Sequence, residues 1–126
     1  MASNKAFRFG PVALTTTLTT NILNPGTTTG GTNCTAAPYD KLNLILRHIR
    51  IVNKTGSAAT VSLWLGASAG NVAGTEFAFQ ATSIPANSYV DWYGALNMST
   101  ADFLVGGSGT TTALSIEGEG EIGVGA

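Results

Sequence analysis

Apolar side chains recur at every second position along much of this chain, and this period constrains the fold more than any other feature. The alternation is clearest in Val12–Ile22, Thr60–Gly66 and Tyr89–Tyr93. A period of two places successive side chains on opposite faces of an extended strand, whereas an amphipathic helix has a period of about 3.6 residues. No segment keeps the helical period long enough to build a layer of helices. The sequence therefore predicts an all-β protein.

Turn-forming residues divide these segments into short strands. The changes of phase predict a bend at Gly10-Pro11 and a bulge near Arg47-His48. Leu42–Val52 and Thr60–Gly66 are predicted to pair as a β-hairpin, and Gly94–Ala101 is predicted to hold one helical turn. About seven to nine strands at intervals of about 8–12 residues are typical of an antiparallel sandwich. We predict a jelly-roll-like β-sandwich, with a small closed barrel as the alternative.

The chain is long enough for one domain, residues 1–126. We expect residues 1–9 to form an N-terminal arm that contacts a partner, with Phe7, Arg8 and Phe9 in that contact. Residues 117–126 are rich in glycine and begin with a Glu-Gly alternation, which leaves the strand register weakly specified. This segment is therefore predicted to be a C-terminal strand that exchanges with another chain.

Charged residues make up only 10% of the chain, and the net charge is −1. Soluble domains usually carry about 25%. The densest basic group is Arg47, His48 and Arg50, which is too small to neutralise a nucleic-acid backbone. No apolar run reaches the roughly 20 residues of a membrane span, and the N-terminus lacks the apolar block of a signal peptide. We expect a protein made in the cytoplasm, without a nucleic-acid or membrane partner.

Residues for catalysis or metal binding are few. His48 is the single histidine and Cys34 the single cysteine, so we expect no internal disulfide and no zinc or other metal site within the chain. No Gly-x-Ser-x-Gly motif is present. The sequence predicts neither an enzyme nor a bound cofactor, and His48 is expected to face solvent or an interface.

Three carboxylates share one face of the last strand. Glu117, Glu119 and Glu121 stand at a spacing of two, which separates neighbouring carboxylates by about 6–7 Å. A calcium site usually draws its oxygens from a turning loop. We therefore favour edge protection or interface polarity over a cation site for these residues.

Two aromatic segments carry further candidates. Trp64 lies on the polar phase of its strand, so we expect it to be exposed at an interface. Trp92 is expected in the core, which would turn Tyr89, Asp91 and Tyr93 outward. Tyrosines beside a carboxylate suit stacking and hydrogen bonding with a sugar or a protein.

The later part of the chain resembles small β-sandwich virion proteins of tailed bacteriophages. The likeness lies in Leu46-Arg-His-Ile-Arg-Ile-Val-Asn-Lys-Thr55, in Ile84-Pro-Ala-Asn-Ser-Tyr-Val-Asp-Trp-Tyr93 and in Ala113-Leu-Ser-Ile-Glu-Gly-Glu119. It is similar to the strand and loop layout of head decoration and cement proteins and of tail appendages. The resemblance implies a structural protein of the virion and supplies no active-site residue.

Two functions follow as expectations. The first is a capsid decoration or cement protein that binds the major capsid protein as a homo-oligomer, taken as a trimer. Few charges suit a protein that is assembled rather than free. The second is a carbohydrate- or receptor-binding module that meets a glycan through Trp64 or the Tyr89/Asp91/Tyr93 strand. The expected partner contacts are the arm, the Thr27–Ala37 loop and the C-terminal strand, with the following residues: Phe7, Arg8, Phe9, Arg47, His48, Arg50, Trp64, Glu117, Glu119 and Glu121.

Overall fold

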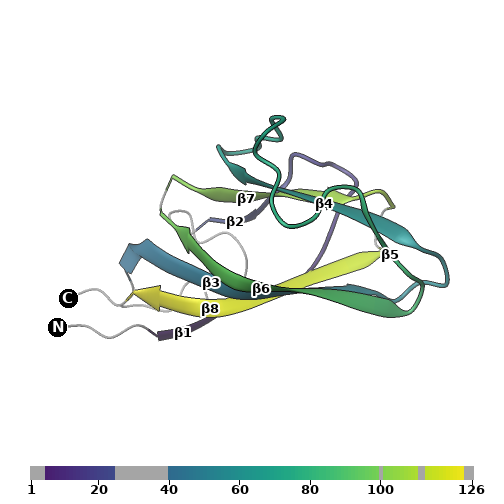
Figure 1. The fold of residues 1–126 in the computed structure, drawn as a ribbon, viewed down its shortest axis with the longest axis horizontal. Coiled ribbons are helices and arrows are strands. Elements are labelled where there is room, and N and C mark those ends of the chain that lie inside the picture. The colour runs from purple at the N-terminus through teal and green to yellow at the C-terminus, as the bar shows by residue number, and fades with distance from the viewer. Residues whose placement is uncertain (1–4, 25–39, 100, 111–112, 124–126) are drawn as a thin grey trace.

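Two antiparallel four-stranded sheets pack face to face in the computed structural model, which describes residues 5–24, 40–99, 101–110 and 113–123 (Figure 1). The first sheet has the order β1 (Lys5–Ala13), β8 (Leu114–Gly123), β3 (Asp40–Asn53) and β6 (Ser88–Met98). The second has the order β2 (Asn21–Leu23), β7 (Phe103–Ser108), β4 (Ala59–Gly66) and β5 (Thr82–Ile84). The described residues form no helix. The predicted all-β sandwich is confirmed.

The strand pairs are nested along the chain. β1 pairs with β8, β2 with β7, β3 with β6 and β4 with β5. This nesting is the order of a jelly roll, in which a long antiparallel ribbon wraps into two packed sheets. It brings β3, β6 and β8 side by side although they are far apart in the sequence.

The core lies between the two sheets and takes one phase of each long strand. Ile49 and Ile51 of β3 are fully buried, as are Val61 and Leu63 of β4. The hairpin predicted for Leu42–Val52 and Thr60–Gly66 is wrong, because β3 and β4 belong to different sheets. Their phases nevertheless both point into the core. Periodicity identifies the buried face of a strand, but not the neighbour to which the strand bonds.

The alternation of Val12–Ile22 predicts a single strand, and this prediction is wrong. β1 and β2 cover only its two ends. Between them the Thr15 and Thr20 hydroxyls lie 2.9 Å apart, and the Thr20 hydroxyl donates to the Thr17 carbonyl at 2.7 Å. Threonine hydroxyls that bond locally compete with a strand ladder, so the alternation here continues through turns.

Both predicted irregularities are confirmed, and the predicted helical turn is wrong. The register shifts between Phe9 and Val12, at the Gly10-Pro11 bend, and between Leu46 and His48. In place of a helical turn from Gly94, β6 continues to Met98, and beyond it the Asp102 amide donates to the Ser99 carbonyl at 3.1 Å.

The two ends of the described chain are paired strands. β1 begins at Lys5, and Phe7 and Phe9 are buried at 2% and 0% exposure, so the predicted contact arm is wrong for these side chains. The alternation of the segment explains this, because its aromatic phase faces the core. β8 is hydrogen-bonded on both sides within the chain. Its exchange with another chain stays a prediction, and residues 1–4 and 124–126, like Cys34 and the Thr27–Ala37 loop, lie outside the described residues.

Candidate binding face

Most of the described charged side chains gather on the outer side of the β1-β8-β3-β6 sheet. His48 and Arg50 alternate with the buried Ile49 and Ile51, so they point away from the core. The register sets His48 opposite Glu119 and Tyr93, and Arg50 opposite Glu117 and Asp91. Residues directly opposite one another share a face of the sheet. We call the following set the outer face: Arg8, Arg47, His48, Arg50, Tyr89, Asp91, Tyr93, Glu117, Glu119 and Glu121.

The imidazole of His48 lies between carboxylates on both neighbouring strands. Its Nε2 is 2.8 Å from Asp91 Oδ1 on β6, and its Nδ1 is 3.0 Å from Glu119 Oε1 on β8. The ring also stacks on Tyr93, with 4.6 Å between centroids and 16° between planes. These contacts fix both the position and the orientation of the imidazole.

Asp91 also accepts from Arg50, in a two-point contact. Arg50 Nε lies 2.8 Å from Oδ1, and Nη2 lies 3.2 Å from Oδ2. The guanidinium sits 4.4 Å from the ring centroid of Tyr89. The hydrogen bond from Arg50, aided by His48, lowers the pKa of Asp91 against the opposing effect of burial, and the same bond raises the pKa of Arg50.

Burial and hydrogen bonding act on His48 in opposite directions. Burial lowers its pKa, but the hydrogen bonds and charges of Asp91 and Glu119 together outweigh it and raise the pKa above 6.5. Protonated His48 is therefore more favourable in the folded chain than in the unfolded chain.

This imbalance predicts a pH dependence of stability. The contribution of His48 is fully present below its unfolded pKa of about 6.5 and is lost as the pH rises through the higher folded pKa. The free energy of unfolding, measured by urea denaturation from about pH 6 to about pH 9, should fall more in the native chain than in His48→Gln. Identical slopes in the two proteins would contradict the prediction.

The glutamate row on β8 is not at a sheet edge, so the predicted edge protection is wrong. β8 lies between β1 and β3, and the edges of this sheet are β1 and β6. Glu121 bonds to Arg47 Nε at 2.7 Å, and Glu119 bonds to His48. Within the described part of the chain, the carboxylate of Glu117 makes no hydrogen bond or ion pair.

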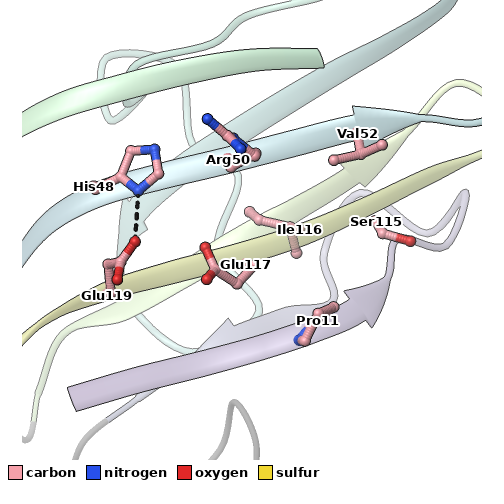
Figure 2. Close-up of a pocket in the computed structure, with 8 residues that line it drawn as sticks. All are labelled: Pro11, His48, Arg50, Val52, Ser115, Ile116, Glu117 and Glu119. Atoms are coloured by element: carbon pink, nitrogen blue, oxygen red, sulfur yellow. Dashed lines mark hydrogen bonds and ion pairs between the residues drawn. The ribbon is translucent and has the colours of Figure 1, made fainter. Parts of the chain in front are cut away.

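A hollow of about 350 Å³ opens on the outer face between β1, β8 and β3 (Figure 2). His48 and Arg50 line it from β3, Glu117 and Glu119 line it from β8, and Pro11 contributes from the bend of β1. Ligand atoms of His48, Glu117 and Glu119 lie within 4.8 Å of one another. This set of one imidazole and two carboxylates can therefore bind a cation. The prediction from the sequence counted only the one cysteine and the one histidine and did not combine His48 with the glutamates.

The aromatic candidates divide between core and surface. Trp64 is only 5% exposed, so its predicted exposure is wrong. Residues 75–79 hydrogen-bond along β4, and both phases of that strand are buried from Val61 to Trp64. Trp92 packs against the core, as predicted, and meets Phe77 edge to face at 5.0 Å.

Tyr89 and Tyr93 are 54% and 70% exposed, which confirms the outward Tyr-Asp-Tyr set. The structure thus unites seven of the predicted contact residues with these tyrosines and Asp91. It places the others, Phe7, Phe9 and Trp64, in the interior. The sequence signal for Asp91 was its phase alone, because nothing local shows that β6 lies beside β3.

No family model, curated protein or solved structure matches this chain. Among the residues that the structure describes, there is no helix with the length and hydrophobicity that crossing a bilayer requires. Function is therefore inferred from the fold and the outer face.

Proposed function

We propose that this chain is a structural virion protein of a tailed bacteriophage, a capsid decoration or cement protein that binds the major capsid protein as a homo-oligomer. The observation that carries the proposal is a jelly roll whose outer sheet face gathers exposed tyrosines among paired charges. Jelly rolls serve as viral capsid and lectin domains. Because a fold alone does not decide function, the choice of the virion rests on the resemblance of the sequence.

The outer face has the properties of a protein contact surface. Tyrosine and arginine are enriched in such interfaces, and here Tyr89 and Tyr93 project beside Arg50 and His48. Arg50 already neutralises Asp91, so docking does not leave those two charges unpaired. The ring contacts order both tyrosines in advance, which reduces the entropy lost on binding.

The proposal predicts that Tyr89→Ala/Tyr93→Ala loses capsid binding while the fold is retained. A single hot-spot residue at the centre of an interface contributes about 2 kcal/mol or more, so binding should weaken at least about 30-fold even if only one of the two tyrosines is such a residue. The measurement is co-sedimentation of the purified protein with phage capsids that were assembled without this protein. Val72→Ala is a matched control, because Val72 is 65% exposed in the segment after β4, outside the outer face.

Unchanged co-sedimentation of the double variant would place the contact elsewhere. Peptide quantification in purified virions supplies the second readout. A decoration protein should be present in many copies that scale with the capsid subunits. A few copies per virion would instead favour a tail appendage.

The exposed Tyr89, Asp91 and Tyr93 also favour a second function, a carbohydrate-binding module. Tyrosine rings can stack on a sugar while the carboxylate accepts from its hydroxyls. Light scattering and a glycan array separate the two functions. A stable monomer that binds a defined glycan, and loses it in Tyr93→Ala, would overturn the capsid proposal. An oligomer that co-sediments with capsids and ignores glycans would overturn the glycan proposal.

A further inference from the structure

Two neighbouring strands bring three metal-ligand groups together beside the hollow. β3 supplies His48, and β8 supplies Glu117 and Glu119, with their ligand atoms within 4.8 Å of one another. On a straight strand, alternate side chains start about 6–7 Å apart. Here both carboxylates turn toward the imidazole of His48 on the neighbouring strand. Figure 2 shows this for Glu119 and its bond to His48.

The imidazole is oriented as in many metal sites. Metal-binding histidines usually donate their second ring N–H to a carboxylate, which fixes the tautomer and the ring. Asp91 occupies that place at Nε2, and Arg50 holds Asp91 in turn. With its proton at Nε2, neutral His48 turns the lone pair of Nδ1 toward Glu119 on β8.

Glu117 adds a carboxylate that the fold does not otherwise use. It makes no hydrogen bond or ion pair with the described residues. Arg50, its partner in the register, directs its guanidinium to Asp91. Arg8, opposite Glu119 on β1, makes no ion pair within the described chain. Two carboxylates and the imidazole therefore face the hollow, and no arginine among the described residues pairs with Glu117 or Glu119.

We propose that His48, Glu117 and Glu119 bind one divalent transition metal ion of the zinc class on the outer face, with Asp91 as the orienting partner. Zinc accepts imidazole nitrogen and carboxylate oxygen, and three protein ligands leave a position for water. The hollow of about 350 Å³ gives that water room. A nitrogen donor disfavours calcium and magnesium, which prefer oxygen ligands.

Binding replaces the hydrogen bond between His48 and Glu119 with two bonds to the metal. The imidazole must be neutral, so any proton on Nδ1 is released to solvent, and affinity falls as the pH is lowered. The site is independent of the proposed function, because it requires neither a capsid nor a glycan.

In the experiment, zinc chloride is titrated into tag-free, metal-free protein. Calorimetry measures the binding, and nitrogen NMR monitors the imidazole during the titration. Every histidine signal belongs to His48, since the chain has one histidine. The background is Cys34→Ser, because a free thiolate also binds zinc. We expect one equivalent of zinc to bind, the Nδ1 resonance to shift as a ligand nitrogen, and Nε2 to keep its proton.

Variants identify the ligands. Glu117→Gln should weaken zinc binding at least about tenfold, and Asp91→Asn about 10–100-fold. Glu117→Gln should leave the fold intact, because the carboxylate of Glu117 has no partner among the described residues. Glu121→Gln is the matched control on the same strand and face, and it should bind zinc like the parent. Unmoved His48 signals, or equal affinity in Glu117→Gln and Glu121→Gln, would overturn the proposal.

Discussion

Replacing Gly118 with valine should lower the free energy of unfolding by about 3 kcal/mol or more, because the space for its side chain is already filled. Gly118 is buried on the inner phase of β8, opposite Phe9 of β1 and Ile49 of β3. A Cβ at this position would overlap the ring of Phe9. That ring is fully buried, so it cannot move aside without disturbing its packing in the core. Urea denaturation followed by circular dichroism measures the loss.

A double-mutant cycle shows whether the ring is the cause. Phe9→Ala alone should cost about 3–5 kcal/mol through the cavity it leaves. Combined with Gly118→Val, the valine fills part of that cavity, so the two costs should be less than additive by about 0.5–3 kcal/mol. Gly56→Val is the control, since no atom lies within 4 Å of its added Cβ. Strict additivity would mean that Gly118 is required for another reason.

The same contact explains the Glu-Gly alternation that the sequence left ambiguous. Outward positions of β8 carry Glu117 and Glu119, while the inward position between them holds glycine because Phe9 lies over it. From the sequence, the glycines suggested a weak register and an exchanging strand. The structure gives the glycine at 118 a packing reason as well, because a large ring and a missing side chain complement each other across β1 and β8.

Period-two patterning predicted the fold class because it reports burial directly. Ile49, Ile51 and Leu63 stand on the apolar phases of their strands and lie in the core. The pattern failed where burial covers both faces of a strand, as at Trp64, and where turns continue the alternation, as at Thr17. It also carries no information on strand neighbours, which is why β3 and β4 were paired wrongly.

The candidate site shows the same limit. The outward phases of His48, Asp91 and Glu119 are readable in the sequence, but His48 and Glu119 are 71 positions apart. Their contact exists because the jelly roll places β8 beside β3 and sets the register so that the two residues face each other. Each local property was accessible, whereas the cluster depends on long-range pairing.

Replacing Asn53 with aspartate is the other change for which we expect a large loss of stability. Asn53 ends β3, is fully buried, and its amide nitrogen donates to carbonyls of the other sheet's β5 turn, Ile84 at 3.1 Å and Pro85 at 3.2 Å. The same nitrogen donates to Ser57 at 2.9 Å, and its oxygen accepts from the Thr55 amide at 2.9 Å. The Asn53 side chain therefore joins β3 of one sheet by hydrogen bonds to the end of β5 in the other sheet and to the connection between β3 and β4.

Aspartate keeps the acceptor and replaces the donor with a second oxygen that faces three carbonyls. Unsatisfied buried groups cost about 1–3 kcal/mol, and more when charged, so Asn53→Asp should lose about 3 kcal/mol or more near neutral pH. Burial and the carbonyls should raise the folded pKa of the new carboxyl above its unfolded value of about 3.9.

The deficit should therefore shrink as the pH falls toward about 4, because the protonated carboxyl can donate to one carbonyl. Asn53→Ala, which adds no charge, should lose stability without this trend. Asn97→Asp on the exposed part of β6 is the matched control and should change stability by no more than about 0.5 kcal/mol. Urea denaturation of the three variants from about pH 4 to about pH 8 measures these differences. If Asn53→Asp matched Asn97→Asp at every pH, the amide of Asn53 would not be what joins the sheets.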